Sequence, residues 1–117
     1  MVHDRFSAVQ GQLLVHAPSA FTPEVLNSLA DSILNALSTQ RCDIVILDLS
    51  NTNYLDKEEF YALKRLAHMA ELMGPQLVLV GLNAGIVRYL IDINVDTSKL
   101  IITRDIEQAL NRQKAMT

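Results

Sequence analysis

The residues best suited to chemistry lie in one short polar stretch, Ser50–Glu59, which follows the apolar run 44–49 and precedes a long helical pattern. Within it, Asp56, Lys57 and Glu58 place two carboxylates and an ammonium group at an expected helix start. In α/β proteins, sites form where parallel strands end and helices begin, because the free N–H groups of a helix start attract negative charge. We therefore expect the functional centre of the chain at these three residues.

The other reactive residue types do not combine into a catalytic or metal-binding pattern. His3, His16 and His68 have no second ligand at metal-ligand spacing, and no nucleophile–base pair follows from the spacing of the residues. The single cysteine, Cys42, cannot form an internal disulfide and is interpreted as a half-buried packing residue. Gly81–Gly85 lacks the spacing of a phosphate-binding loop, which favours a tight turn over an anion site. We predict no enzyme, no cofactor and no metal.

Asp48 ends the apolar run and raises one further enzymatic alternative, a phosphorylated receiver with acidic residues gathered at strand ends. The sequence lacks an acidic pair on a first strand and has too few strand–helix units for a five-stranded receiver. We therefore predict that Asp48 is a structural acceptor, which binds backbone amides of the turn that follows it.

Composition narrows the function classes. The chain has 117 residues, of which 50% are hydrophobic, enough for the core of one domain. A formal net charge of -3 gives no electrostatic footprint for nucleic acid. The segment Met1–Arg5 has no apolar stretch typical of a signal peptide, and no apolar run approaches the roughly 18 residues of a membrane span. We expect a cytoplasmic, single-domain protein over residues 1–117.

The apolar spacing predicts alternating strands and helices after a short antiparallel pair in residues 1–16, with a turn at Gly11. Buried strands are expected at 43–49, 77–80 and 100–102, and helices between and after them. Thr22 is the expected N-cap of the first helix, with Pro23 next to it, and Asp56 or Lys57 opens the second. Asn83 and Thr103 are the expected caps of the last two helices. Helical connections between buried strands favour parallel pairing.

The order of several motifs resembles the STAS domain, the domain of bacterial anti-sigma-factor antagonists and of sulfate-transporter cytoplasmic tails. The motifs are Val45–Ser50, Leu55–Asp56 with a following helix, Leu72–Gly74, Leu77–Gly81 and Asp105–Leu110. The resemblance covers nearly the whole chain and is closest to the stressosome branch, the RsbS- and RsbR-type scaffold proteins. It implies an α/β fold of STAS type. The sheet would be mixed and mostly parallel, with four to five strands, an antiparallel N-terminal edge and about four helices.

In that family, a Ser or Thr directly after the family Asp is phosphorylated by a partner kinase, usually of the histidine-kinase-like ATPase class. Asp56 matches the family Asp, but Lys57 occupies the phosphoacceptor position and cannot accept phosphate as a hydroxyl does. A cation at a helix start is also unfavourable, by roughly 0.3–1 kcal/mol. Two interpretations remain: the protein is a binding module that does not switch, or phosphorylation has moved elsewhere, for which Thr22 and Ser19 are the candidates.

The resemblance implies a non-enzymatic regulatory protein that binds a kinase, an anti-sigma factor or other STAS scaffold proteins, as a homo- or hetero-oligomer. An accessory subunit of a transport complex, or a small-ligand-binding module, is the alternative. The expected partner-binding surface comprises Ser50, Asn51, Tyr54, Asp56, Lys57, Glu58 and Glu59, with Asn83–Gly85 as an extension.

Overall fold

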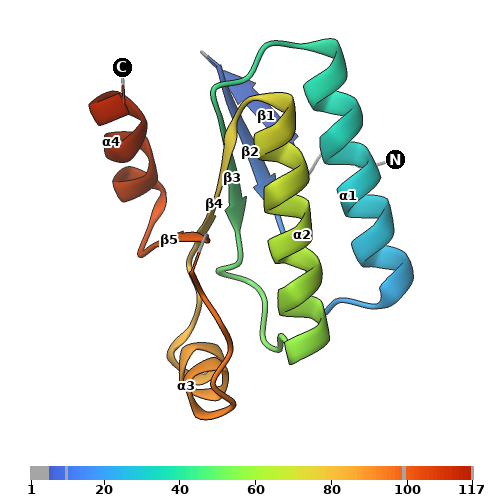
Figure 1. Cartoon of the computed structure of the whole chain (residues 1–117), viewed down its shortest axis with the longest axis vertical. Helices are drawn as coiled ribbons and strands as arrows, with labels where there is room; N and C mark the ends of the chain where they lie inside the picture. The colour runs from blue at the N-terminus through green and yellow to red at the C-terminus, as the bar shows by residue number, and fades with distance from the viewer. Residues whose placement is uncertain (1–5, 10, 99, 117) are drawn as a thin grey trace.

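The computed structural model describes residues 6–9, 11–98 and 100–116, which form one five-stranded sheet and four helices (Figure 1). The strands are β1 (Phe6–Val9), β2 (Gln12–His16), β3 (Ile44–Asp48), β4 (Gln76–Val80) and β5 (Ile101–Thr103). The helices are α1 (Pro23–Thr39), α2 (Lys57–Met73), α3 (Ala84–Asp92) and α4 (Ile106–Met116).

The strands follow one another across the sheet in the order β1-β2-β3-β4-β5. β1 is antiparallel to β2, and each later pair is parallel. The predicted mixed sheet with an antiparallel N-terminal edge is therefore confirmed from residue 6 onward, whereas residues 1–5, including His3, lie outside the described residues. Because β2–β5 run in the same direction, their carboxyl ends meet at one edge of the sheet.

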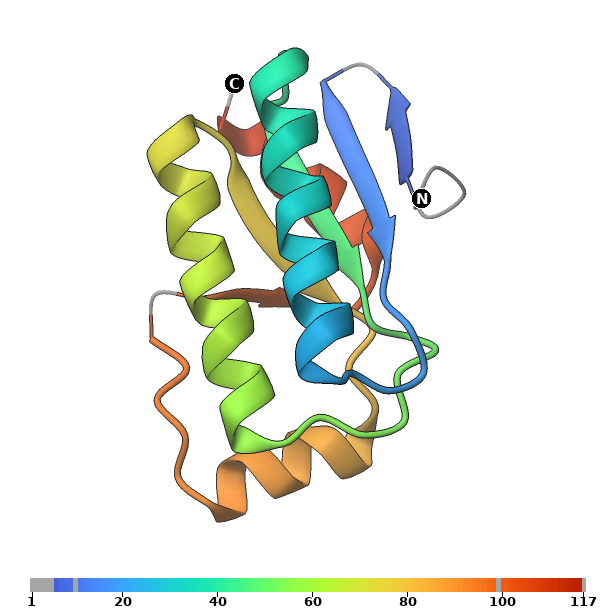
Figure 2. The ribbon, with the colours of Figure 1, turned by 90° about the vertical axis from the view of Figure 1, so that its right-hand side faces the viewer.

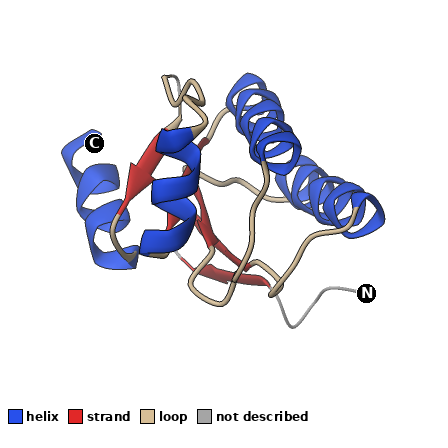
Figure 3. Ribbon diagram, turned by 90° about the horizontal axis from the view of Figure 1, so that it is seen from below, coloured by secondary structure: helices blue, strands red, loops and turns tan. Residues whose placement is uncertain are grey.

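Helices cover both faces of the sheet. α1 and α2 pack on one face and α4 on the other, while α3 lies at the end where the parallel strands terminate (Figures 1 and 3). The central strand β3 has apolar side chains on both faces, which is why helices cover both. Val45 and Leu47 pack into the core beneath α1 and α2, whereas Ile44 and Ile46 pack into the smaller cluster with Ala109 of α4. This strand is buried on both faces, as its continuous apolar run predicted.

One predicted helix start is wrong. Thr103 is the last residue of β5 and does not cap α4. Asp105 takes that role, because its Oδ1 accepts a hydrogen bond from the Gln108 N–H at 2.9 Å. The strand extends one residue further than the apolar run suggested, so the turn and the cap move toward the C-terminus. The Thr103 hydroxyl instead donates to the Asp105 carbonyl at 3.1 Å.

Candidate functional site

Three loops meet at the edge where the parallel strands end. The β3–α2 loop is tied to the β2–α1 loop by the Thr52 hydroxyl, which donates to the Pro18 carbonyl at 2.7 Å, and by the Asn53 N–H, which donates to the Ser19 carbonyl at 2.9 Å. Thr52 is only 1% exposed. Because an enclosed hydroxyl needs a partner, this bond fixes the path of the loop toward α2.

Asn83 ties the same loop to α3. Its side-chain oxygen caps α3 by accepting from the Ile86 N–H at 2.8 Å, as predicted, and its amide nitrogen donates to the Thr52 carbonyl at 3.2 Å. Figure 2 shows the β3–α2 loop running alongside α3 at this end of the molecule. One side chain therefore positions a helix and a loop together.

Asp48 is the structural acceptor that the sequence predicted. Its Oδ1 accepts from the Ser50 N–H at 2.9 Å, and its Oδ2 lies 3.2 Å from the Nδ1 of His16, at the end of β2. Gly81 packs against this turn with φ of 77°, and a Cβ there would lie 3.0 Å from Ser50 and 3.1 Å from the Asp48 carboxylate. Glycine is required here because other residues rarely adopt this backbone conformation and because a Cβ would crowd Ser50 and Asp48.

The start of α2 is a capping box. The Asp56 carboxylate accepts from the Glu59 N–H at 2.8 Å, and the Glu59 carboxylate accepts from the Asp56 N–H at 3.0 Å. Each side chain thus satisfies a backbone donor that the helix leaves open. Both carboxylates are held in place, which makes Asp56 a structural cap and explains why α2 begins at Lys57.

Lys57 is the first residue of α2 and is exposed. Among the residues that the structure describes, its ammonium group has no ion-pair or hydrogen-bond partner. A cation at this position opposes the helix dipole, and the acidic groups of Asp56, Glu58 and Glu59 in the same turn offset it. The expected phosphoacceptor position therefore lies at the surface, at a helix start, with a side chain that is free to meet a partner.

Tyr54, in the β3–α2 loop, is 58% exposed. Slight desolvation, together with the charge of Asp56 and the proximity of Tyr89 and Glu59, raises the pKa of its hydroxyl. The phenol therefore stays protonated at neutral pH, as a hydrogen-bond donor at the end of a large apolar ring. Exposed tyrosines of this kind are frequent anchors in protein interfaces.

The structure brings the predicted surface residues together on the β3–α2 loop and the first turn of α2. We call this set the carboxyl-edge surface: Ser50, Asn51, Tyr54, Asp56, Lys57, Glu58 and Glu59. Thr22 and Ser19 are exposed on the adjacent β2–α1 loop, and the Thr22 hydroxyl caps α1 by accepting from the Val25 N–H at 3.1 Å. Sequence reasoning missed the buried role of Thr52, because a polar residue in a turn-like Asn-Thr-Asn run reads as exposed.

Other kinds of site find little support in the described parts of the chain. They contain no group of three or more His, Cys, Asp or Glu side chains that could hold a metal ion. Across residues 6–9, 11–98 and 100–116, no helix has the length and apolar character needed to cross a bilayer. Cys42 is half-buried, and burial raises the pKa of its thiol, so the thiolate is disfavoured.

Comparison with known proteins identifies the fold and the family. The STAS domain family model matches residues 5–109. Similar solved structures include an RsbS variant from Moorella thermoacetica, with 16% identity, a TM-score of 0.78 and coverage of 95% of this chain and 94% of that one. A putative anti-sigma factor antagonist from Thermotoga maritima has 16% identity, a TM-score of 0.76 and 96% coverage of both chains.

A transporter carries the same fold as one part of a larger chain. The murine anion transporter Slc26a9 has 19% identity and a TM-score of 0.71, with coverage of 97% of this chain but 19% of that one. No curated protein matches the sequence closely enough to count as a relative. At these identities the structures show the fold alone, and the family model supplies the membership.

The chain folds into an α/β sheet with a capped helix start at its carboxyl edge, and the family model matches most of its length. Together these define the class of protein. This chain belongs to the STAS domain family. The resemblance noted in the sequence is therefore confirmed, including its likeness to RsbS and to an anti-sigma factor antagonist.

Proposed function

We propose that this chain is a non-enzymatic regulatory protein of the cytoplasm, a single STAS domain over residues 1–117. It would bind protein partners in a partner-switching or stressosome-like pathway. The observation that carries the proposal is the start of α2, where Lys57 is exposed and unpaired while Asp56 and Glu59 are held in the capping box. This arrangement offers a rigid surface for docking and no hydroxyl for phosphate.

The proposed interface is the carboxyl-edge surface. Tyr54 supplies the apolar anchor, and Glu58 and Lys57 supply opposite charges beside it. The loop that carries them is fixed by Thr52 and Asn83, so a partner would not have to order it on binding. The partners proposed are a Ser/Thr kinase of the histidine-kinase-like ATPase class, an anti-sigma factor or other STAS scaffold proteins, in a homo- or hetero-oligomer.

The test compares two charge reversals at equivalent helix positions. Glu58 and Glu107 lie in the first turns of α2 and α4, so Glu58→Lys and Glu107→Lys disturb the helix dipole equally. Tagged wild-type chain and both variants are used to capture partners from a native lysate, which mass spectrometry identifies. We expect a kinase, an anti-sigma factor or another STAS protein to be retained by wild type and Glu107→Lys and lost with Glu58→Lys. Equal retention by all three chains would refute the proposed interface.

The second test concerns phosphate. Incubation with the captured kinase and ATP should add no phosphate at position 57 of the wild-type chain, because Lys57 has no hydroxyl. We expect Lys57→Ser to fold, since the side chain is exposed and unpaired, and to gain phosphate at position 57. Phosphate on Thr22 or Ser19 of the wild-type chain would show that regulation has moved to the β2–α1 loop. A modified Lys57 would contradict the proposal.

The fold shared with part of Slc26a9 supports a second candidate, an accessory subunit of a transport complex or a small-ligand-binding module. The capture experiment separates the two candidates, because a transporter subunit in place of signalling proteins would favour this one.

A further inference from the structure

A second recess lies away from the carboxyl-edge surface, between α2 and α4. It has a volume of about 1130 Å³, and α2, β4, β5 and α4 all contribute to its walls. Gln76, which contributes to it, is the first residue of β4, so the recess lies at the opposite end of that strand from the loops described above. A partner bound at one end would leave the other accessible.

The recess exposes an incomplete sheet edge. β5 pairs only with Val78–Val80 of β4, so Gln76 and Leu77 have no neighbouring strand on that side among the described residues. Leu100 and Ile101, at the start of β5, line the recess directly beside this gap. An unpaired strand edge presents backbone donors and acceptors, which an added extended segment can satisfy.

One buried atom in the recess also lacks a partner. The side-chain oxygen of Gln76 is enclosed and accepts no hydrogen bond from the described residues. An unsatisfied buried carbonyl costs free energy. The Gln76 side chain has to turn toward the recess before an N–H donor of a bound segment can reach this oxygen. A peptide backbone carries such donors, whereas a phosphate ion, with oxygens on every side, is a poor match for an acceptor.

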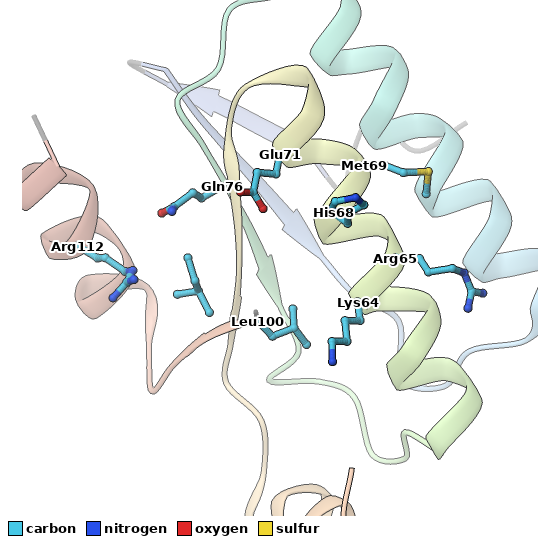
Figure 4. A pocket seen from close by; sticks show the side chains of 9 residues that line it. Lys64, Arg65, His68, Met69, Glu71, Gln76, Leu100 and Arg112 are labelled. Carbon is cyan, nitrogen blue, oxygen red and sulfur yellow. The ribbon is translucent and has the colours of Figure 1, made fainter. Parts of the chain in front are cut away.

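Cationic side chains outnumber carboxylates in the lining, although the net charge of the chain is -3. Lys64, Arg65 and Arg112 contribute cations, and Glu71 contributes one carboxylate. Figure 4 shows Arg112 reaching from α4 and Lys64 from α2 toward the sheet edge between them, whereas Arg65 points to the far side of α2. Lys64 already binds the Asp96 carbonyl at 2.7 Å, and its ammonium lies 3.4 Å from the Asp96 carboxylate. Arg112 has no such partner among the described residues, so it is the cation best placed to bind a ligand.

We propose that this recess, which we call the α2–α4 groove, binds an extended acidic segment of another protein. The segment would lie along the open edge of β4, with backbone N–H groups facing Gln76. Its acidic side chains would face Arg112, and its apolar ones would rest on Leu100 and Ile101. The mixture of cations and aliphatic surface fits a chain of alternating acidic and apolar residues better than a free anion.

The experiment uses the isotope-labelled full chain and a synthetic peptide of alternating Glu and Val, titrated to millimolar concentration at low ionic strength. A peptide of alternating Lys and Val is the matched control. We expect the Glu–Val peptide to shift the NMR signals of the Gln76 side-chain amide and of the Leu77 and Ile101 backbone amides. The Lys–Val peptide should leave them unchanged. Absence of these shifts would overturn the proposal.

Two charge reversals locate the contact. Arg112→Glu should weaken binding of the Glu–Val peptide by about fivefold, the scale of one exposed ion pair. Arg88→Glu makes the same change on α3, outside the groove, and should alter binding by less than about twofold. Both side chains are exposed, and circular dichroism checks that both variants fold. Equal weakening by the two variants would overturn the proposal, because it would show attraction to charge in general.

Two other occupants are tested directly. Inorganic phosphate that displaces the peptide and produces the same shifts would identify a small-anion site and overturn the proposal. Concentration-dependent shifts at the same residues without peptide would identify a second copy of the chain as the occupant, which also overturns it. Because the groove and the carboxyl-edge surface are separate, either proposal can fail without the other.

Discussion

The buried hydroxyl of Thr52 offers a sharp test of how the β3–α2 loop is held. Thr52→Val keeps the β-branched shape and nearly the same volume, so it removes the hydroxyl without opening a cavity. It deletes the 2.7 Å hydrogen bond to the Pro18 carbonyl and leaves that carbonyl without this donor. The expected loss in the free energy of unfolding is roughly 1 kcal/mol, the net contribution of one such hydrogen bond.

The matched control is Thr39→Val. The Thr39 hydroxyl also donates to a backbone carbonyl, that of Ala36 at 3.2 Å, but the residue is exposed at the end of α1 and water can replace the bond. We expect a loss of less than about 0.5 kcal/mol there. Urea denaturation with an unchanged slope measures both values. Thermal melting should rank the two variants in the same order. For a chain of this size the melting temperature should fall by roughly 4 °C for each kcal/mol of stability lost.

The result also bears on function. If Thr52 fixes the loop, Thr52→Val should speed amide hydrogen exchange at Asn53, whose N–H donates to the Ser19 carbonyl. Equal stability of the Thr52 and Thr39 variants, with unchanged exchange at Asn53, would refute the argument that this hydroxyl positions the carboxyl-edge surface.

Three further predictions follow from single contacts. Asn83→Ala should cost roughly 1 kcal/mol of stability in urea denaturation, because the cap of α3 and the bond to the Thr52 carbonyl are both lost. Asp56→Ala should lower the stability by roughly 1 kcal/mol, whereas Glu59→Gln should leave it nearly unchanged, since glutamine also completes a capping box. A larger loss with Glu59→Gln than with Asp56→Ala would contradict the capping box. NMR titration should give Asp96 a pKa of about 2, because the Ser98 hydroxyl and amide and the Lys64 ammonium stabilise its carboxylate. The associated stability is present above pH 3.8 and declines as the pH falls toward 2, and Lys64→Met should raise this pKa.

The sequence was most informative where the relevant interactions are local. The caps at Thr22 and Asn83 were predicted correctly, and the start of α2 was placed at Asp56 or Lys57, of which Asp56 is the cap. Each of these three capping side chains binds a backbone N–H three residues further along the chain. The cap of α4 was misplaced to Thr103, since the pattern does not show where an edge strand stops. A strand end depends on its pairing partner, here the register of β5 against β4.

Features of the candidate site were likewise predictable from the sequence only where they depend on local interactions. The presence of Lys57 at an exposed helix start follows from the sequence, because a polar turn precedes an amphipathic helix that begins with acidic residues. The bonds of Thr52 to Pro18 and of Asn83 to Thr52 join residues 34 and 31 positions apart, and no local pattern encodes them. They exist because the parallel strands bring three loops to one edge of the sheet.

The sequence by itself therefore determined the order of the elements, the burial of β3 on both faces and the position of a lysine at the start of α2. Each of these follows from the spacing of residue types along a few turns or one strand. Only the tertiary structure decided that Thr52 is buried, that His16 lies beside Asp48, and that the short β5 leaves a groove between α2 and α4. These features depend on strand register and on packing between distant segments, which residue order alone does not specify.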